Sequence, residues 1–148
     1  RKDFILDEAQ VYQARAAGAD AVLLIVAALE PARLAELYHL AGELGLTVLI
    51  EVHARDELAP ALNLRPPLLG INNRDLKTLA VSLETCVRLR PLVPPEVLVV
   101  AESGINDPGD IARLRASGLG AFLVGSALMR APDPAAAVAA LAEAGRRP

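Results

Sequence analysis

The stretches VVAESGI at residues 99–105 and AFLVGS at residues 121–126 decide the fold of this chain. Each is an apolar run that ends at a small polar residue or glycine, and a helical pattern follows it. Two such ends in consecutive β/α units bring backbone N–H groups together in a cup that can hold a phosphate. The pattern therefore predicts parallel β/α units and a phosphorylated small-molecule ligand.

Apolar runs and amphipathic segments alternate along the whole chain. Strands are predicted at residues 3–6, 21–26, 47–52, 68–72, 97–101 and 121–124, and helices at residues 7–17, 30–44, 56–64, 83–92, 108–117 and 133–144. Residues 21–26 are wholly apolar, which is typical of a parallel strand buried on both faces. This alternation predicts a parallel α/β sheet with right-handed crossovers.

The two glycine-containing strand ends fit a (β/α)8 barrel, in which phosphate binds after the last two strands. A complete barrel takes about 250 residues, whereas this chain has 148. We therefore expect a single domain over residues 1–148, a partial (β/α)8 TIM barrel. It would supply about six β/α units, strands 3 to 8, including the phosphate-binding half.

The composition excludes several classes of protein. The chain is 53% hydrophobic, which is enough for a sizeable core. Its net charge is −3 and it has no basic block, so the composition gives no support for nucleic-acid binding. Its longest apolar run, residues 21–29, is far shorter than the ~20 residues that span a bilayer. Cys86 is the single cysteine, and His39 and His53 lack a third ligand at metal spacing, so neither a disulfide nor a metal site is expected. No signal peptide is recognised, and a cytoplasmic location is expected.

Polar side chains stand at four of the predicted strands. The first strand carries Lys2, while Glu51, Asn72 and Glu102 stand at the ends of the third, fourth and fifth strands, and Ser103 follows Glu102. The carboxyl ends of barrel strands carry the active site. Each residue alone also fits a salt-bridged position at the rim. A lysine and two carboxylates at one mouth can set each other's pKa values and transfer protons, so together they indicate acid–base chemistry.

Six segments carry a resemblance to a known family. They are RKDFI (1–5), GADAVLLI (18–25), LIEVH (49–53), GINNRDL (70–76), AESGI (101–105) and VGSALM (124–129). Through them, almost the whole chain resembles the carboxy-terminal part of indole-3-glycerol phosphate synthase, a (β/α)8 enzyme of tryptophan biosynthesis. The KDF start and the GINNRDL stretch are specific to that family, whereas many phosphate-binding barrels share the two glycine-containing strand ends.

The resemblance implies a reaction and its catalytic residues. The family closes the ring of 1-(2-carboxyphenylamino)-1-deoxyribulose 5-phosphate, with loss of carbon dioxide and water, and uses no cofactor or metal. Lys2 matches the general acid that assists ring closure. Glu51 matches the carboxylate that helps proton removal and positions that lysine. Asn72 matches a hydrogen-bonding residue that faces the substrate, and Glu102 matches a second carboxylate.

The resemblance also implies the substrate-binding residues. Arg74 matches a basic residue near the charged end of the substrate, and Ser103 matches a polar contact to the glycerol phosphate. Gly104, Gly125 and Ser126 match the backbone cradle for the phosphate. Glycine suits such a cradle because the chain can approach the anion without a Cβ atom in the way.

The family's first two β/α units have no counterpart in this sequence, nor do a glutamate and a second lysine of the family's first strand. The isolated chain is therefore expected to be inactive, with partners in the missing amino-terminal units or in self-association through open sheet edges. Two alternatives remain open at this stage. One is another phosphate-binding barrel enzyme of the same pathway, similar to phosphoribosylanthranilate isomerase, and the other is a non-catalytic barrel fragment.

Overall fold

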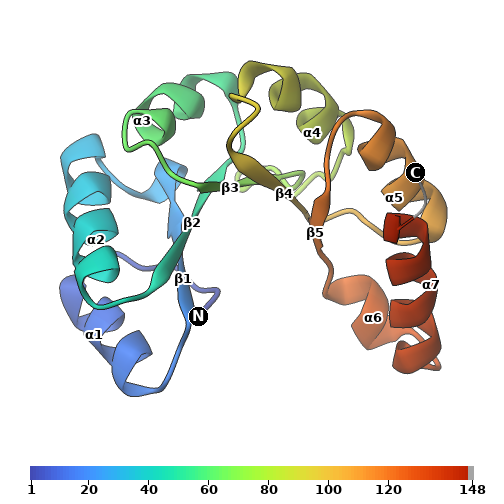
Figure 1. Cartoon of the computed structure of the whole chain (residues 1–148), viewed down its shortest axis with the longest axis horizontal. Helices are drawn as coiled ribbons and strands as arrows, with labels where there is room; N and C mark the ends of the chain where they lie inside the picture. The colour runs from blue at the N-terminus through green and yellow to red at the C-terminus, as the bar shows by residue number, and fades with distance from the viewer. Residues whose placement is uncertain (147–148) are drawn as a thin grey trace. The chain divides into compact units, whose positions relative to one another are not determined.

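A computed structural model describes residues 1–146, and these contain one five-stranded sheet. The strands are β1 (Ala21–Ile25), β2 (Thr47–Val52), β3 (Leu68–Asn72), β4 (Leu98–Glu102) and β5 (Ala121–Leu123). They follow one another in chain order (Figure 1), and β1 runs parallel to β2 as β4 does to β5. The chain divides into two compact units, residues 1–70 and residues 71 onward, with the boundary inside β3. The predicted alternation is confirmed for these strands.

In the first unit, helices and short 3-10 turns connect the strands. They are α1 (Glu8–Ala16), η1 (Val26–Ala28), α2 (Pro31–Glu43), η2 (Arg55–Glu57) and α3 (Leu58–Leu62). Asp7 caps α1 by accepting from the Ala9 N–H, and Pro31 stands in the first turn of α2. Helix α2 packs against α1 and covers β1 and β2 (Figure 1). Val22 to Ile25 of β1 are all buried, as their wholly apolar sequence predicts.

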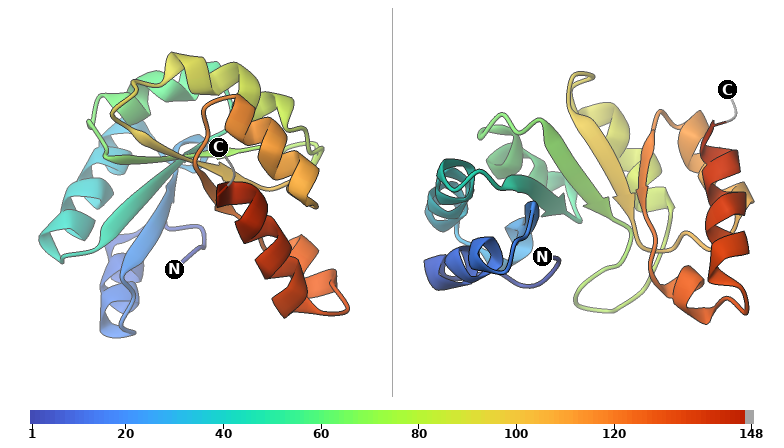
Figure 2. Two further views of the ribbon diagram at one scale, coloured as in Figure 1. Left: turned by 45° about the vertical axis from the view of Figure 1, so that its right-hand side comes forward. Right: turned by 60° about the horizontal axis from the view of Figure 1, so that its bottom comes forward.

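In the second unit, the helical elements are α4 (Glu84–Leu89), η3 (Arg90–Leu92), α5 (Pro108–Ala116), α6 (Ser126–Arg130) and α7 (Pro134–Arg146). Asp107 caps α5 by accepting from the N–H groups of Gly109 and Asp110. Helices α5 and α7 lie side by side (Figures 1 and 2). Helix α6 was not predicted, because five residues are too few to show a helical period.

The strand predicted at residues 3–6 is absent. Arg1 extends the pattern of the sheet, since its amino group donates to the Ala21 carbonyl and its carbonyl accepts from the Leu23 N–H. After Arg1, the backbone groups form hydrogen bonds with side chains and not with a neighbouring strand. Asp3 accepts from the Phe4 N–H, and Gln10 bonds the Phe4 carbonyl and the Leu6 N–H. Local side-chain hydrogen bonds thus replace a strand ladder in this segment.

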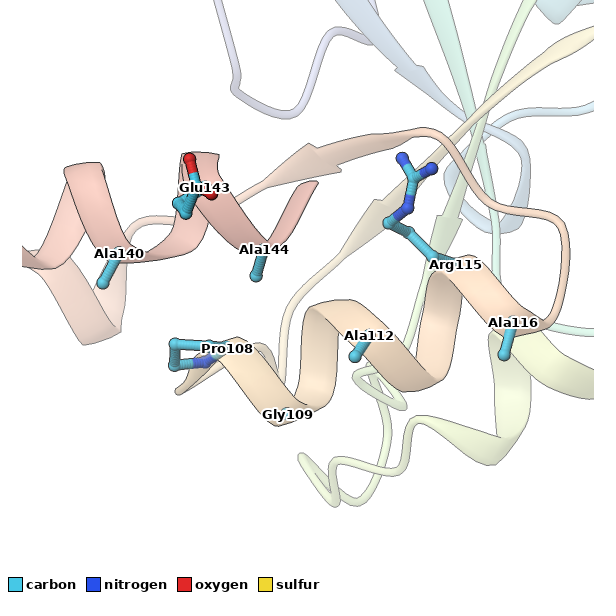
Figure 3. A pocket seen from close by; sticks show the side chains of 8 residues that line it. All are labelled: Pro108, Gly109, Ala112, Arg115, Ala116, Ala140, Glu143 and Ala144. Atoms are coloured by element: carbon cyan, nitrogen blue, oxygen red, sulfur yellow. The ribbon is translucent and has the colours of Figure 1, made fainter. Parts of the chain in front are cut away.

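A groove in the second unit runs between α5 and α7 (Figure 3). Small residues on both helices line it, among them Gly109 and Ala112 on α5 and Ala140 and Ala144 on α7. No predicted site residue is part of this lining. The groove is therefore a feature of helix packing, distinct from the candidate site. No helix of residues 1–146 has both the length and the apolar character needed to cross a bilayer.

Candidate active site

The first unit holds a buried carboxylate paired with a lysine. Glu51 is the fifth residue of β2, and only 1% of its side chain is exposed. Lys2 Nζ lies 3.2 Å from Glu51 Oε2 and donates to it. The lysine side chain is 45% exposed, whereas that of its partner is almost wholly buried. An ionised carboxylate is tolerated at such depth only with a compensating charge and hydrogen bonds, which Lys2 supplies in part.

His53 extends this pair into a four-residue cluster. His53 follows the end of β2, and its Nε2 lies 3.1 Å from Glu51 Oε1. Its Nδ1 lies 3.3 Å from Glu57 Oε2, and the same carboxylate oxygen accepts from the His53 backbone N–H at 2.7 Å. Burial lowers the pKa of His53, but the interactions with the neighbouring carboxylates of Glu51 and Glu57 outweigh it and raise that pKa to about 9. The ring is thus an imidazolium at neutral pH.

The sequence interpretation missed His53. It considered the histidine only as a metal ligand, and found no third ligand beside it. The signal that could have exposed it is the pattern Glu51, His53, Glu57, in which a histidine leaves a strand between two acidic residues. In the part of the chain that the structure describes, no group of three His, Cys, Asp or Glu side chains has the arrangement of a metal site.

In the second unit, Asn72 and Glu102 stand at the carboxyl ends of the neighbouring strands β3 and β4. Both are buried, Glu102 fully. The Asn73 N–H donates to the Glu102 carbonyl at 2.8 Å, which joins the two strand ends. Asn72 Oδ1 accepts from the Arg74 N–H at 3.0 Å and so fixes the turn out of β3. The structure therefore brings these two predicted residues to one end of the sheet.

Ser103 and Gly104 adopt consecutive left-handed conformations after β4, with φ of +62° and +79°. This conformation is costly for serine. Asn73 holds the turn, because its Nδ2 donates to the Ser103 carbonyl at 3.0 Å. The Oδ1 of Asn73 accepts from the Cys86 N–H at the start of α4. Asn73 is thus a buried clamp between the Ser103 turn and α4, and the sequence interpretation did not single it out.

Cys86 is part of the core beside this clamp. Its side chain is fully buried, and its Sγ donates to the Ile71 carbonyl at 3.5 Å. Burial raises the pKa of the Cys86 thiol to about 12, so the reactive thiolate is not populated at neutral pH. Cys86 is therefore a small residue of the core.

Arg74 begins the exposed loop that follows β3. Its Nη1 donates to the Leu79 carbonyl at 3.3 Å, and Arg74 forms an antiparallel bridge with Val81. Asp75 accepts from the N–H groups of Lys77 and Thr78, which closes the loop on itself. These contacts hold the guanidinium against its own loop, next to the strand end that carries Asn72.

Gly125 and Ser126 form the start of α6. Gly125 is the N-cap residue, and no side chain caps this helix. At α5, in contrast, the Asp107 carboxylate occupies the N–H groups of the first turn. A Cβ atom added at Gly125 would meet nothing within 4 Å, so the helix start is open on that side. Of these two helix starts, that of α6 is the one without a side-chain cap.

The fold and these strand-end polar residues define a class of protein, the β/α barrels with polar side chains at the carboxyl ends of their strands. Thiamine phosphate pyrophosphorylase from Pyrococcus furiosus has a similar fold, with a TM-score of 0.72 at 24% identity over 91% of this chain and 63% of that chain. A KDPGal structure gives a TM-score of 0.60 at 21% identity, covering 98% of this chain and 91% of that one. Similarity at this level of identity concerns the fold alone.

The sequence comparison goes further. The family model of indole-3-glycerol phosphate synthase matches residues 1–141, and the chain belongs to this family. It is 55% identical to indole-3-glycerol phosphate synthase of Paracidovorax citrulli over 141 residues, and 53% identical to that of Laribacter hongkongensis over 142 residues. These matches cover 95% of this chain, but 53% and 54% of the relatives. The chain thus spans about half the length of these relatives, and its structure is a partial (β/α)8 barrel.

Proposed function

We propose that this chain is part of an indole-3-glycerol phosphate synthase, a carbon-carbon lyase of tryptophan biosynthesis. The reaction closes the ring of 1-(2-carboxyphenylamino)-1-deoxyribulose 5-phosphate, with loss of carbon dioxide and water, to give indole-3-glycerol phosphate. The observation that carries the proposal is the contact of Lys2 with the buried carboxylate of Glu51, at 3.2 Å. Family membership supports it, because the family model matches a span that includes both residues.

In this proposal Lys2 is the general acid. A buried carboxylate beside it favours the ammonium form, which can donate a proton to the substrate carbonyl region as the ring closes. Glu51 orients that ammonium group and assists proton removal. Asn72 donates or accepts a hydrogen bond at the substrate, and Glu102 acts as a second carboxylate. The burial of both side chains at strand ends supports these roles.

The phosphate is proposed to bind at the glycine-containing strand ends. Gly104, Gly125 and Ser126 offer backbone N–H groups, and the uncapped start of α6 supports this assignment. Ser103 would contact the glycerol phosphate chain. Arg74 would attract the charged end of the substrate, although the structure holds its guanidinium at its own loop.

The active form is proposed to require β/α units beyond these 148 residues, because relatives of the family are about twice as long. Residues 1–148 would then act as one domain that carries the phosphate-binding half. The partner is either the segment that completes the barrel or a second copy that associates through an open sheet edge. Cytoplasmic synthesis of a small metabolite, with no nucleic-acid or membrane partner, fits this role.

The test is formation of indole-3-glycerol phosphate by the chain alone and after addition of the segment of the Paracidovorax citrulli relative that the chain does not cover. Product is expected only in the mixture or in a fusion of the two. Lys2→Ala in the same fusion is the matched control and should abolish most turnover. A fusion that instead isomerises phosphoribosylanthranilate, or turns over neither compound, would overturn the proposal.

A further inference from the structure

We infer that His53 is a positioning residue of the active site: its ring bridges Glu51 and Glu57 and thereby fixes the Glu51 carboxylate toward Lys2. The inference rests on the proposed function, since it assigns the task of Glu51 to the same reaction. It adds a residue that touches neither the substrate nor the reacting atoms, and it explains why a histidine occupies this strand end.

The geometry engages the two oxygens of Glu51 from different partners. Oε2 accepts from Lys2 Nζ at 3.2 Å, while Oε1 lies 3.1 Å from His53 Nε2. Lys2 holds one oxygen by a hydrogen bond, and the imidazole ring attracts the other as an ion-pair partner, so rotation of the carboxylate about its terminal bond would lengthen one of these contacts. The orientation of Oε2, and with it the position of the lysine ammonium group, therefore depends on the imidazole ring.

Glu57 fixes the other side of the ring. Its Oε2 lies 3.3 Å from His53 Nδ1 and accepts from the His53 backbone N–H at 2.7 Å. Glu57 is in η2, directly after the turn out of β2, so main chain and side chain of His53 are held by one carboxylate. The His53 side chain is only 9% exposed and that of Glu57 17%, so water competes weakly for these contacts.

The charges of this cluster balance when the ring carries a proton on both nitrogens. Lys2 and His53 then supply two positive charges against the carboxylates of Glu51 and Glu57. A neutral ring could donate to one carboxylate only, and its second nitrogen would face the other as a lone pair. The raised pKa of His53, to about 9, agrees with the doubly protonated form. Arg55 and Asp56, the other charged residues of η2, are exposed to solvent.

The first experiment reads the ring directly in the chain as it exists. The chain has two histidines, so His39→Gln assigns the ring signals of His53 in a nitrogen NMR titration. Both ring nitrogens of His53 are expected to carry protons at pH 7.5, with a titration midpoint near 9. Glu57→Gln, which keeps an acceptor but removes the charge, should lower that midpoint. A ring that is singly protonated at pH 7.5 would overturn the inference.

The second experiment measures turnover in the fusion that completes the barrel. His53→Gln is expected to lower kcat by about 10–100-fold, the size of effect that misplaced catalytic groups produce, with KM nearly unchanged. Its pH profile should lose the alkaline limb that titration of His53 imposes. His39→Gln, on the exposed face of α2, is the matched control and should leave kcat unchanged. If His53→Gln fails to fold, kcat and the pH profile are measured for Glu57→Gln, which disturbs the same ring from its other side.

The two hypotheses fail differently. If the unsubstituted fusion makes no indole-3-glycerol phosphate, the proposed function fails, and the inference, which rests on it, fails with it. If the fusion is active but His53→Gln matches His39→Gln in kcat and in pH profile, the inference alone is overturned. A loss confined to KM would also contradict it, because a group that orients the acid should act on the chemical step.

Discussion

Substitution of Gly104 by alanine tests whether the turn after β4 is as tightly enclosed as the structure shows. Gly104 has φ of +79°, a conformation that side chains with a Cβ atom rarely adopt. A Cβ atom there would lie 2.6 Å from Val81 Cγ1 and 3.3 Å from Leu83 Cδ2. The first distance is too short for any real contact, so Val81 or the turn itself has to move.

Gly118 provides a matched control in the same unit. Its φ is +82°, and a Cβ atom added there would meet only Arg90 Cγ and Nε, both at 4.0 Å. Gly118→Ala therefore carries the conformational cost of a left-handed alanine, about 1–2 kcal/mol, without a clash. Gly104→Ala adds overpacking, which costs about 1–3 kcal/mol. Val81 is 42% exposed and can yield, so the added cost is expected at the lower end of that range, about 1 kcal/mol.

The measurement is urea unfolding of both variants, followed by far-ultraviolet circular dichroism because the chain has no tryptophan. Gly104→Ala should lower the free energy of unfolding by about 2–3 kcal/mol and Gly118→Ala by about 1–2 kcal/mol, with equal denaturant slopes. Equal losses for the two variants would refute the reasoning, because they would mean that Val81 and Leu83 do not enclose Gly104.

Four further predictions concern single groups. The fold raises the pKa of His53 from 6.5 to about 9, so protonation of the ring stabilises the fold. This contribution, at most ~3 kcal/mol, is fully present below pH 6.5 and is lost as the pH rises through 9. The free energy of unfolding should therefore be lower at pH 10 than at pH 6, and His53→Gln should lack this difference. In the fusion, Lys2→Ala should lower kcat about 10²–10⁴-fold, whereas Ser103→Ala should mainly raise KM; the reverse pattern would contradict the roles assigned. Asp107→Ala removes the cap of α5 and should cost about 1 kcal/mol in urea unfolding, and an unchanged midpoint would count against the cap. Gly125→Val should weaken phosphate binding measured by calorimetry, and unchanged affinity would argue against the cradle.

Much of the fold follows from local sequence. The wholly apolar run of β1, the proline that begins α2 and the left-handed Gly45 beyond that helix are short-range signals, and they determine element type and approximate bounds. The same signals placed Glu51, Asn72 and Glu102 at strand ends, because a polar residue after an apolar run marks where a parallel strand leaves the sheet. They failed at residues 3–6, where side-chain hydrogen bonds replaced the ladder, and at α6, which is too short to show a period.

The tertiary structure alone determined which of the site residues contact one another. Lys2 and Glu51 are 49 positions apart, and Asn73 reaches Ser103 across 30, so no local pattern could reveal either contact. Whether a charge is buried, and which group compensates it, depends on the neighbouring strands that pack around it. The imidazolium of His53 is the clearest case: the sequence supplies a histidine between two glutamates, but only the fold sets its ring nitrogens 3.1 and 3.3 Å from their carboxylates and thereby determines its charge.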